Sequence, residues 1–398
     1  MTSARNNHRG FTLIEVLVAS TIALLAMSVA TLAFLSQQKA AVALDLTRVA
    51  NEASRDALLE MDSSLRRLGW GIDPRYGLDF RNYSCPAVPC RDKINAPDEI
   101  VFVARNPNYR WFDNGVGGCT TAGGCYTGKA WHGSVANTTV TVVANVGDTF
   151  QAGRLLLVTC TNGTKATMAR VAATVTAGAA GNLNVTVMAP VAGNPYLENA
   201  WSLPGADPCY VSAVPQPNIF LVDRYRYAIQ NFNGIPWLVL DTGIDLNGNA
   251  ILPDNGGDLN DLIPIAKGVE DMQIAYMYAP GTTYGFAATD TNTNWIVGDV
   301  SGTVEEPNPT LAAPQYTTPS SDATRFNLHP ANIRGVRITL SIRSLQTDQS
   351  RPASWTGDPL VLSENRNQQL ASFGGLRRYT AATSITVRDL DSRNSFIF

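Results

Sequence analysis

The stretch Arg9-Gly10-Phe11-Thr12-Leu13-Ile14-Glu15 opens a long apolar run that decides the fold. No residue from Val16 to Gln38 is charged, and about 20 apolar residues in a helix match the hydrocarbon core of a bilayer. The run therefore predicts a membrane-spanning helix, which satisfies its own backbone hydrogen bonds. Glu15 is unusual there, because an unpaired charge near the bilayer centre costs about 2–3 kcal/mol or more.

Residues 1–10 form a short basic leader that contains no acidic residue and ends at Gly10. A secretory signal has its apolar region before the cleavage site, whereas here the polar-to-apolar junction itself is conspicuous. The segment Gly10-Phe11-Thr12-Leu13-Ile14-Glu15 resembles the class III signal of type IV pilins and pseudopilins. The resemblance implies that prepilin peptidase cleaves between Gly10 and Phe11 and that Phe11 is then methylated. It also implies that Glu15 meets the N-terminal amine of a neighbouring subunit during assembly. A single-pass anchor with a chance glutamate is the alternative.

The helical pattern continues beyond the membrane segment. Residues 11–68 contain neither proline nor glycine, and the predicted helix extends over 11–69, with 11–38 spanning the membrane. At 1.5 Å per residue this helix is about 85 Å long. Its second half is amphipathic, with small and apolar residues recurring at three- and four-residue steps: Leu46, Ala50, Ala53, Ala57, Met61, Leu65 and Leu68. We expect this face to pack on a globular head.

Residues 70–398 have the short apolar runs and turn residues of a β-rich head. The predicted strands lie at 99–104, 140–143, 155–158, 184–187, 220–229, 237–240, 264–276, 336–343 and 383–388, with a hairpin at Asn233-Gly234. Residues 105–134 are interpreted as loop, about 110–215 as a β-rich insertion, and about 281–330 as a long exposed loop. One long helix followed by strands predicts an α+β fold with an antiparallel sheet.

The bulk composition excludes few functions, but it favours neither an enzyme nor a nucleic-acid binder. The net charge is −3, so no global basic field attracts nucleic acid. Arginine and aromatic residues between positions 75 and 111 are more typical of packing and turns than of a basic groove. Beyond the leader there are two histidines, His132 and His329, and no catalytic motif surrounds either of them.

Six cysteines follow the membrane segment. The basic leader orients the helix with the head outside the inner membrane, where disulfides persist. The pairs Cys85/Cys90 and Cys119/Cys125 are close enough to form local loops, which leaves Cys160 for Cys209. Metal ligation is the alternative, but the spacings lack the paired motif of a zinc site.

The best candidate for a metal site is a calcium loop at Asp245, Asn247 and Asn249, which have the alternating oxygen spacing of the first half of such a loop. The match then fails, because Ala250 stands at the turn glycine and Gly256 at the bidentate glutamate. A solvated turn uses the same residue types. No other cofactor is expected.

Blocks in the head narrow the resemblance to PilW-type minor pilins, and more loosely to J-type pseudopilins of type II secretion. These blocks are residues 65–69, 268–272, 333–338 and 377–379, with Arg388. The resemblance implies a minor pilin of a priming or tip complex, with other minor pilins, major pilins and a large tip adhesin as partners. It would reside in the inner membrane with its head in the periplasm and then enter the pilus, with roles in adhesion and twitching motility. The alternatives are a pseudopilin and a ligand-binding tip subunit that uses the insertion.

Overall fold

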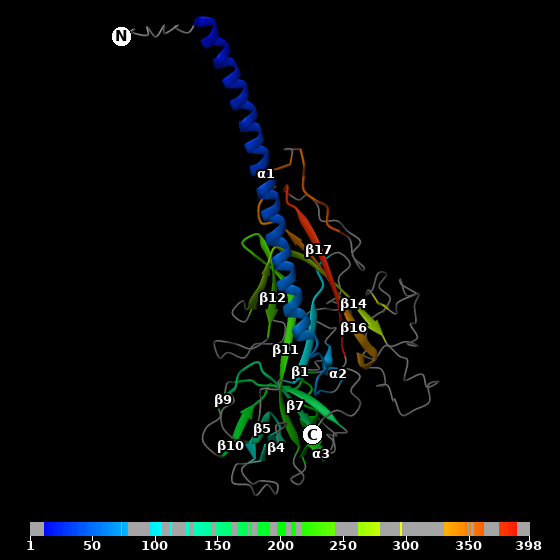
Figure 1. Ribbon diagram of the computed structural model, residues 1–398. Helices are drawn as coiled ribbons and strands as arrows, with labels where there is room; N and C mark the ends of the chain where they lie inside the picture. Colours follow the sequence, from blue (N-terminus) through cyan, green and yellow to red (C-terminus); the bar gives the residue numbers. More distant parts are fainter. Residues whose placement is uncertain are drawn as a thin grey trace.

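The computed structural model of the chain describes residues 12–72, 74–78, 96–105, 112–113, 125–126, 131–144, 149–160, 165–173, 175–176, 181–191, 197–203, 208–211, 217–242, 262–278, 295–296, 330–348, 350–351, 354–361 and 374–387. One long helix, α1 (Leu13–Leu65), projects from an elongated head of antiparallel strands (Figure 1). This is the predicted α+β architecture. The first half of α1 stands free, and the second half lies along the head.

Helix α1 is shorter at both ends than the predicted 11–69. Thr12 is its N-cap and has an extended backbone, and Arg66 is its C-cap. Residues 66–71 form turns, within which the Gly69 N–H bonds to the Val103 carbonyl and the Arg105 N–H bonds to the Trp70 carbonyl. The end of the helix is therefore joined directly to the adjacent strand.

The main sheet is built around β11 (Asn218–Phe232), which is the longest strand described. One part of it pairs with β1 (Ile100–Arg105) and another with β12 (Ile235–Asp241). The hairpin between β11 and β12 turns at Asn233 and Gly234, both with positive φ, as predicted from Asn-Gly. β12 then pairs with the edge strand β13 (Leu262–Lys267).

A second sheet has the order β15-β14-β16-β17, comprising Trp295–Ile296, Val269–Tyr278, Ile333–Arg343 and Arg378–Thr386. Gly268 separates β13 from β14, so the predicted single strand 264–276 is wrong at this point. Its φ is +86°, and a Cβ there would lie 2.7 Å from the Arg343 carbonyl oxygen. The chain uses this glycine to leave one sheet and enter the other, a step that the strand-forming residues on either side do not indicate.

The core lies between α1 and these two sheets. Ala57, Met61 and Leu65 are fully buried against it, as the helical periodicity predicts. Burying a Leu or Met side chain contributes about 1.5–3 kcal/mol. Along β11 the side chains alternate, so that Tyr225 and Tyr227 belong to this core. Burial and then the neighbouring Asp223 raise the pKa of Tyr225 to about 12.

The end of the head farthest from the N-terminus of α1, at the bottom of Figure 1, has a second core of its own. It is formed mainly by β4 (Trp131–Ala136), β5 (Thr139–Ala144), β7 (Leu155–Thr159), β8 (Ala166–Arg170) and β10 (Gly181–Thr186). We call these strands the lower module. β7 pairs with residues 218–222 of β11, so the module shares the central strand of the main sheet.

The short elements among the described residues include the helices α2 (Pro74–Gly77) and α3 (Pro208–Val211) and the 3-10 turns η2 (Ala200–Ser202) and η4 (Pro330–Asn332). The short strands include β2 (Phe112–Asp113), β3 (Cys125–Tyr126), β6 (Thr149–Phe150) and β9 (Val175–Thr176). The prediction of loop for 105–134 is therefore wrong at β2, at β3 and at the start of β4. β8 is absent from the predicted strands, because its sequence ATMAR has Thr167 as its single β-branched residue and no aromatic residue. The predicted loop 281–330 falls almost wholly outside the described residues.

Candidate assembly site

The N-terminus of α1 is closed by a reciprocal capping box between Thr12 and Glu15. The Glu15 N–H donates to Thr12 Oγ1 over 3.3 Å, and Glu15 Oε2 accepts from the Thr12 backbone N–H at 3.0 Å. The Thr12 hydroxyl also donates to Oε2 at 3.1 Å. A carboxylate at this position is also stabilised by the positive end of the helix dipole. Thr12 thus supplies the local partner that the acid needs in an apolar surrounding.

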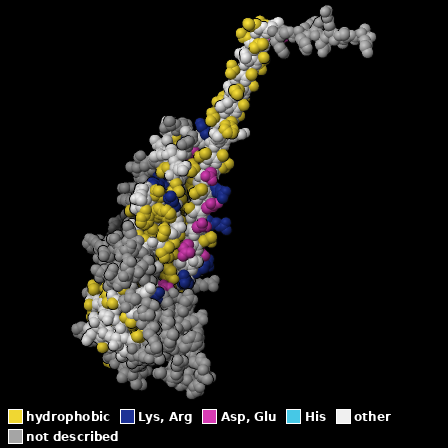
Figure 2. Space-filling model, turned by 90° about the vertical axis from the view of Figure 1, so that its left-hand side faces the viewer, with side chains coloured by type: hydrophobic (Ala, Val, Ile, Leu, Met, Phe, Trp, Pro, Cys, Tyr) yellow, Lys and Arg dark blue, Asp and Glu magenta, His cyan; other side chains and the backbone are white. Residues whose placement is uncertain are grey.

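The residues that follow Glu15 are apolar all round and exposed. α1 is the helix in the described part of the chain that is long and apolar enough to cross a membrane. No residue in its most apolar stretch is buried. Figure 2 shows hydrophobic side chains on the free half of the helix and charged ones where it meets the head. Lys39 is the first charged residue after Glu15. The carboxylate and this lysine therefore mark the two ends of the apolar segment.

Charged side chains line the outward face of the second half of α1 (Figure 2). Arg48 pairs with Glu52 at 2.8 Å, and Arg66 pairs with Asp62 at 2.8 Å, each one helical turn apart. Exposed pairs of this kind stabilise a helix by only about 0.3–0.5 kcal/mol. Their main effect is to keep this face of the helix in water while the opposite face is buried.

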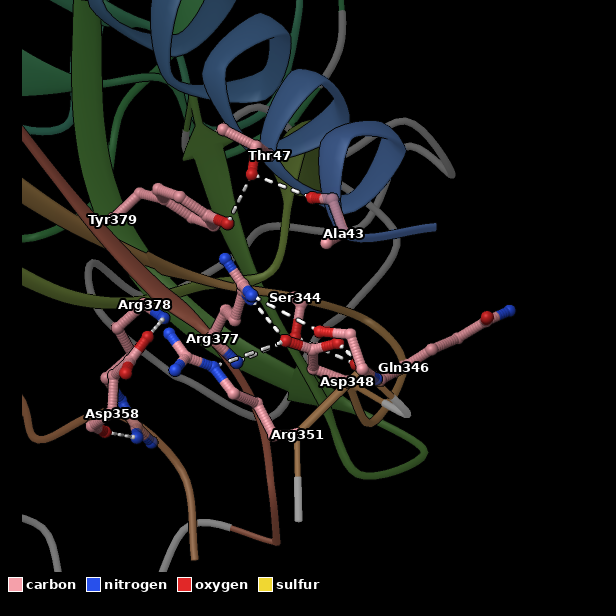
Figure 3. A network of polar contacts seen from close by, with 11 residues as sticks. Ala43, Thr47, Ser344, Gln346, Asp348, Arg351, Asp358, Arg377, Arg378 and Tyr379 are labelled. Carbon is pink, nitrogen blue, oxygen red and sulfur yellow. Dashed lines mark hydrogen bonds and ion pairs between the residues drawn. The ribbon is translucent and has the colours of Figure 1, made fainter. Parts of the chain in front are cut away.

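Two hydroxyl contacts fix the position of α1 on the head. The Tyr227 hydroxyl donates to Ser64 Oγ at 3.0 Å within the core. Near the other end of the packed half, the Tyr379 and Thr47 hydroxyl oxygens lie 2.8 Å apart (Figure 3). The helix is therefore held at both ends of its contact with the sheets.

The head blocks 268–272 and 377–379 meet in the second sheet. Glu270 of β14 and Arg378 of β17 form an ion pair in which the Arg378 guanidinium also donates over 3.1 Å, and both side chains are about 5% exposed or less. In addition, the Asp98 N–H bonds to the Met272 carbonyl, and Asp98 Oδ2 accepts from the Ile274 N–H. These motifs therefore tie strands together rather than forming an open site.

A second group of buried charges lies on β11 and its neighbours. Arg226 bonds to Glu99 at 3.0 Å and to Asp241 at 3.2 Å. Nearby, burial lowers the pKa of Arg105 to about 10, and its guanidinium lies 4.3 Å from the ring centroid of Phe220. These contacts tie β11 to β1 and β12 within the main sheet.

The structure describes some of the predicted site residues and not others. Gly10 and Phe11 lie outside the described residues, as do Asp245, Asn247 and Asn249. Cys160, which follows β7, forms a disulfide with Cys209 of α3, with a Cα–Cα distance of 5.4 Å. Cys85, Cys90 and Cys119 lie outside the described residues and Cys125 belongs to β3, so both local pairings stay predictions. Among the described residues, no three His, Cys, Asp or Glu side chains are grouped to hold a metal ion.

Thr12 is the residue of this site that the sequence analysis does not identify. The partner of Glu15 was expected to be the N-terminal amine, because nothing else in the segment is charged. The T-x-x-E spacing of Thr12 and Glu15 is, however, a capping-box signature and could have been read from the sequence.

Comparison with known proteins agrees with this N-terminal geometry. The family described as "Prokaryotic N-terminal methylation motif" matches residues 5–31, which include the Gly10/Phe11 junction, the capping box and most of the apolar segment. No curated protein and no solved structure matches the chain. The motif implies processing by prepilin peptidase, insertion in the inner membrane and assembly with pilins, in a class of proteins that is generally structural rather than enzymatic. The chain thus carries the N-terminal methylation motif of type IV pilin-like proteins on an α+β pilin-like architecture.

Proposed function

We propose that the protein is a minor pilin that is cleaved between Gly10 and Phe11, is methylated at Phe11 and joins a priming or tip complex of a type IV pilus. Its partners are other minor pilins and the major pilin. In this proposal residues 1–10 are the cleaved leader, residues 11–69 the long helix and residues 70–398 the head with its insertion.

The observation that carries the proposal is the state of Glu15. Its carboxylate bonds only within its own first helical turn among the described residues, through Thr12, at the start of an apolar segment of which nothing is buried. A single helix in a bilayer does not need such a carboxylate, since removing it would make insertion easier. A helix that later packs among others can exchange the Thr12 contact for a neighbour's amine, which gives the acid a role in assembly.

A second candidate function, ligand or adhesin binding by the insertion, is favoured by the separate core of the lower module. Deleting residues 110–215 would not test it cleanly. The deletion would remove β7, the partner of residues 218–222, and would uncover the buried side chains of Ile219 and Leu221. Substitutions of exposed residues such as Val191 and Leu203, each 44% exposed, are the better probe of binding.

The test of the minor pilin function is Glu15→Ala, with the protein quantified in membranes and in sheared pili. We expect unchanged processing and membrane abundance but a sharp fall of the fraction that enters pili. Glu52→Ala is the matched control, because it removes an exposed carboxylate from the same helix without touching the apolar segment.

Undiminished incorporation of Glu15→Ala would contradict the proposal and leave α1 as a simple anchor. A pseudopilin would differ in another respect: the wild-type chain would be absent from pili and its loss would impair protein secretion. Mass spectrometry of the N-terminal peptide tests processing separately, since retention of residues 1–10 in a cell with active prepilin peptidase would contradict cleavage.

A further inference from the structure

Among the described residues of the head, one segment lies closest to the membrane end of α1 (Figure 1). Its described residues are 344–348, 350–351 and 354–361, between β16 and β17, and we call it the collar. Backbone bonds from Ser344, Asp348 and Asp358 to residues 375–377 hold it against the start of β17. In Figure 1 the collar is the orange trace beside α1 at the end of the head nearest the N-terminus.

The helix fixes the height of the collar above the bilayer. Thr47, which bonds to Tyr379 at the start of β17, is eight residues beyond Lys39, or about 12 Å along the axis at 1.5 Å per residue. The polar layer of a bilayer adds about 5–8 Å on each side of its hydrocarbon core. With Lys39 at the edge of that core, Thr47 lies just outside the polar layer. The collar packs on the membrane side of Tyr379, so it faces that layer.

The exposed chemistry of the collar matches a lipid surface. Leu345 and Val361 are apolar but 40% and 53% exposed. Arg351 is half exposed, and its guanidinium lies 5.6 Å from the ring centroid of Trp355. Tryptophan and arginine are the residues that favour the headgroup level of membranes.

The acidic groups of the described collar are occupied by the protein itself. Asp348 is buried and pairs with Arg377 (Figure 3). It also accepts a hydrogen bond from the Ser350 N–H at 2.8 Å. Asp358 accepts from the Arg378 N–H at 3.3 Å. Arg351, by contrast, lies 4.0 Å from Asp348, which is at the outer limit of an ion pair. Half of its side chain stays exposed and can bind an outside anion.

We propose that the collar rests on the periplasmic surface of the inner membrane before assembly, with Leu345 and Val361 entering the interface and Arg351 binding lipid phosphates. The inference rests on the membrane stage of the proposed function. Because α1 and the collar belong to one packed unit, insertion of the helix brings the collar to the lipid without a separate binding event. The contact sets the height and tilt from which the head enters the fibre.

Photo-crosslinking of the full chain in vesicles of phosphatidylethanolamine and phosphatidylglycerol tests the inference. A benzophenone amino acid is placed singly at Leu345 or Val361, at Leu25 as a position inside the bilayer, and at Val191 or Leu203 as exposed apolar controls in the insertion (about 110–215). Intact-mass measurement reports phospholipid adducts. We expect adducts at 25, 345 and 361 and none at 191 and 203.

Adducts at 25 with none at 345 and 361, or equal yields at 345, 361, 191 and 203, would overturn the inference alone. Failure at 25 would overturn the membrane stage of the proposed function and the inference with it. With the probe at 345, Arg351→Gln should lower the adduct yield about fivefold, the effect of one basic residue near an anionic surface. Arg66→Gln, at the far end of the helix, should not, and equal yields from both variants would overturn the role of Arg351.

Discussion

The Tyr379 hydroxyl lies 2.8 Å from the Thr47 hydroxyl, which joins β17 to α1 across 332 residues of sequence. Thr47 donates its only hydroxyl proton to the Ala43 carbonyl, so Tyr379 is the donor of the shared bond. Tyr379→Phe should therefore destabilise the head by about 0.5–1.5 kcal/mol. Denaturant unfolding of Tyr379→Phe, Thr47→Val and the double variant measures the coupling, and fully additive effects would contradict the bond.

Gly268 and Gly234 both have positive φ but different surroundings. A Cβ at Gly268 would lie 2.7 Å from the Arg343 carbonyl oxygen, whereas nothing lies within 4 Å of one at Gly234. Both alanine variants carry the strain of the left-handed backbone, but only Gly268→Ala adds a backbone clash. We expect Gly268→Ala to lower the free energy of unfolding by about 1–3 kcal/mol more than Gly234→Ala does. Equal losses would show that the junction between the sheets can shift to accept a side chain.

Removing one partner of the buried pair Glu270–Arg378 should destabilise the head more than replacing both partners. Arg378→Met leaves Glu270 buried without its cation and should cost about 3–5 kcal/mol. Adding Glu270→Leu should recover most of that loss, because an apolar pair replaces the ionic one. Arg48→Ala, which removes an exposed pair, should cost about 1 kcal/mol or less. A double variant that is as unstable as Arg378→Met would contradict this explanation.

The collar should loosen in acid. Burial works to raise the pKa of Asp348, but hydrogen bonds from Ser350 and Arg377 outweigh it and lower the pKa below its usual value. A lowered folded-state pKa means that this contribution to stability is present above the unfolded-state pKa of about 3.9 and is lost as the pH falls through the folded-state value. Unfolding measured from pH 6 downward should show less pH dependence in Asp348→Asn than in the wild type. An unchanged profile would mean that Asp348 does not titrate with folding.

The disulfide between Cys160 and Cys209 closes 49 residues of the lower module. The chain-entropy model gives about 4 kcal/mol for a loop of this length. In the double variant Cys160→Ala/Cys209→Ala, the lower module should therefore unfold at a lower free energy than the rest of the head. Hydrogen exchange of β5 and β7, compared with that of β16, measures the difference. Equal protection in the variant and the wild type would contradict a stabilising role.

Much of the fold could be predicted because its signals are local. The buried face of α1 follows from the spacing of Ala50, Ala57, Met61 and Leu65, and the β11–β12 hairpin follows from Asn233-Gly234. The assembly site was partly predictable for the same reason, since its junction, acid and apolar run are contiguous in the sequence.

What the sequence did not reveal depends on contacts between distant residues. The break at Gly268 follows from the approach of the Arg343 carbonyl, and β8 is a strand because it pairs with β7. The collar likewise owes its position to bonds with residues 375–377, which the sequence places after a long interval. Periodicity reports which face of an element is buried, but not which element buries it.

The sharing of β11 between the main sheet and the lower module has a mechanical consequence. This strand extends from the module to the hairpin at Gly234, where the Arg343 guanidinium donates to the Gly234 carbonyl at 2.6 Å. A force that pulls on the module while α1 is held in a fibre would act along β11. Its hydrogen bonds to β7 and β12 would then carry the load together, in shear, instead of opening one after another. A head built in this way can hold a tethered load without first unravelling its insertion.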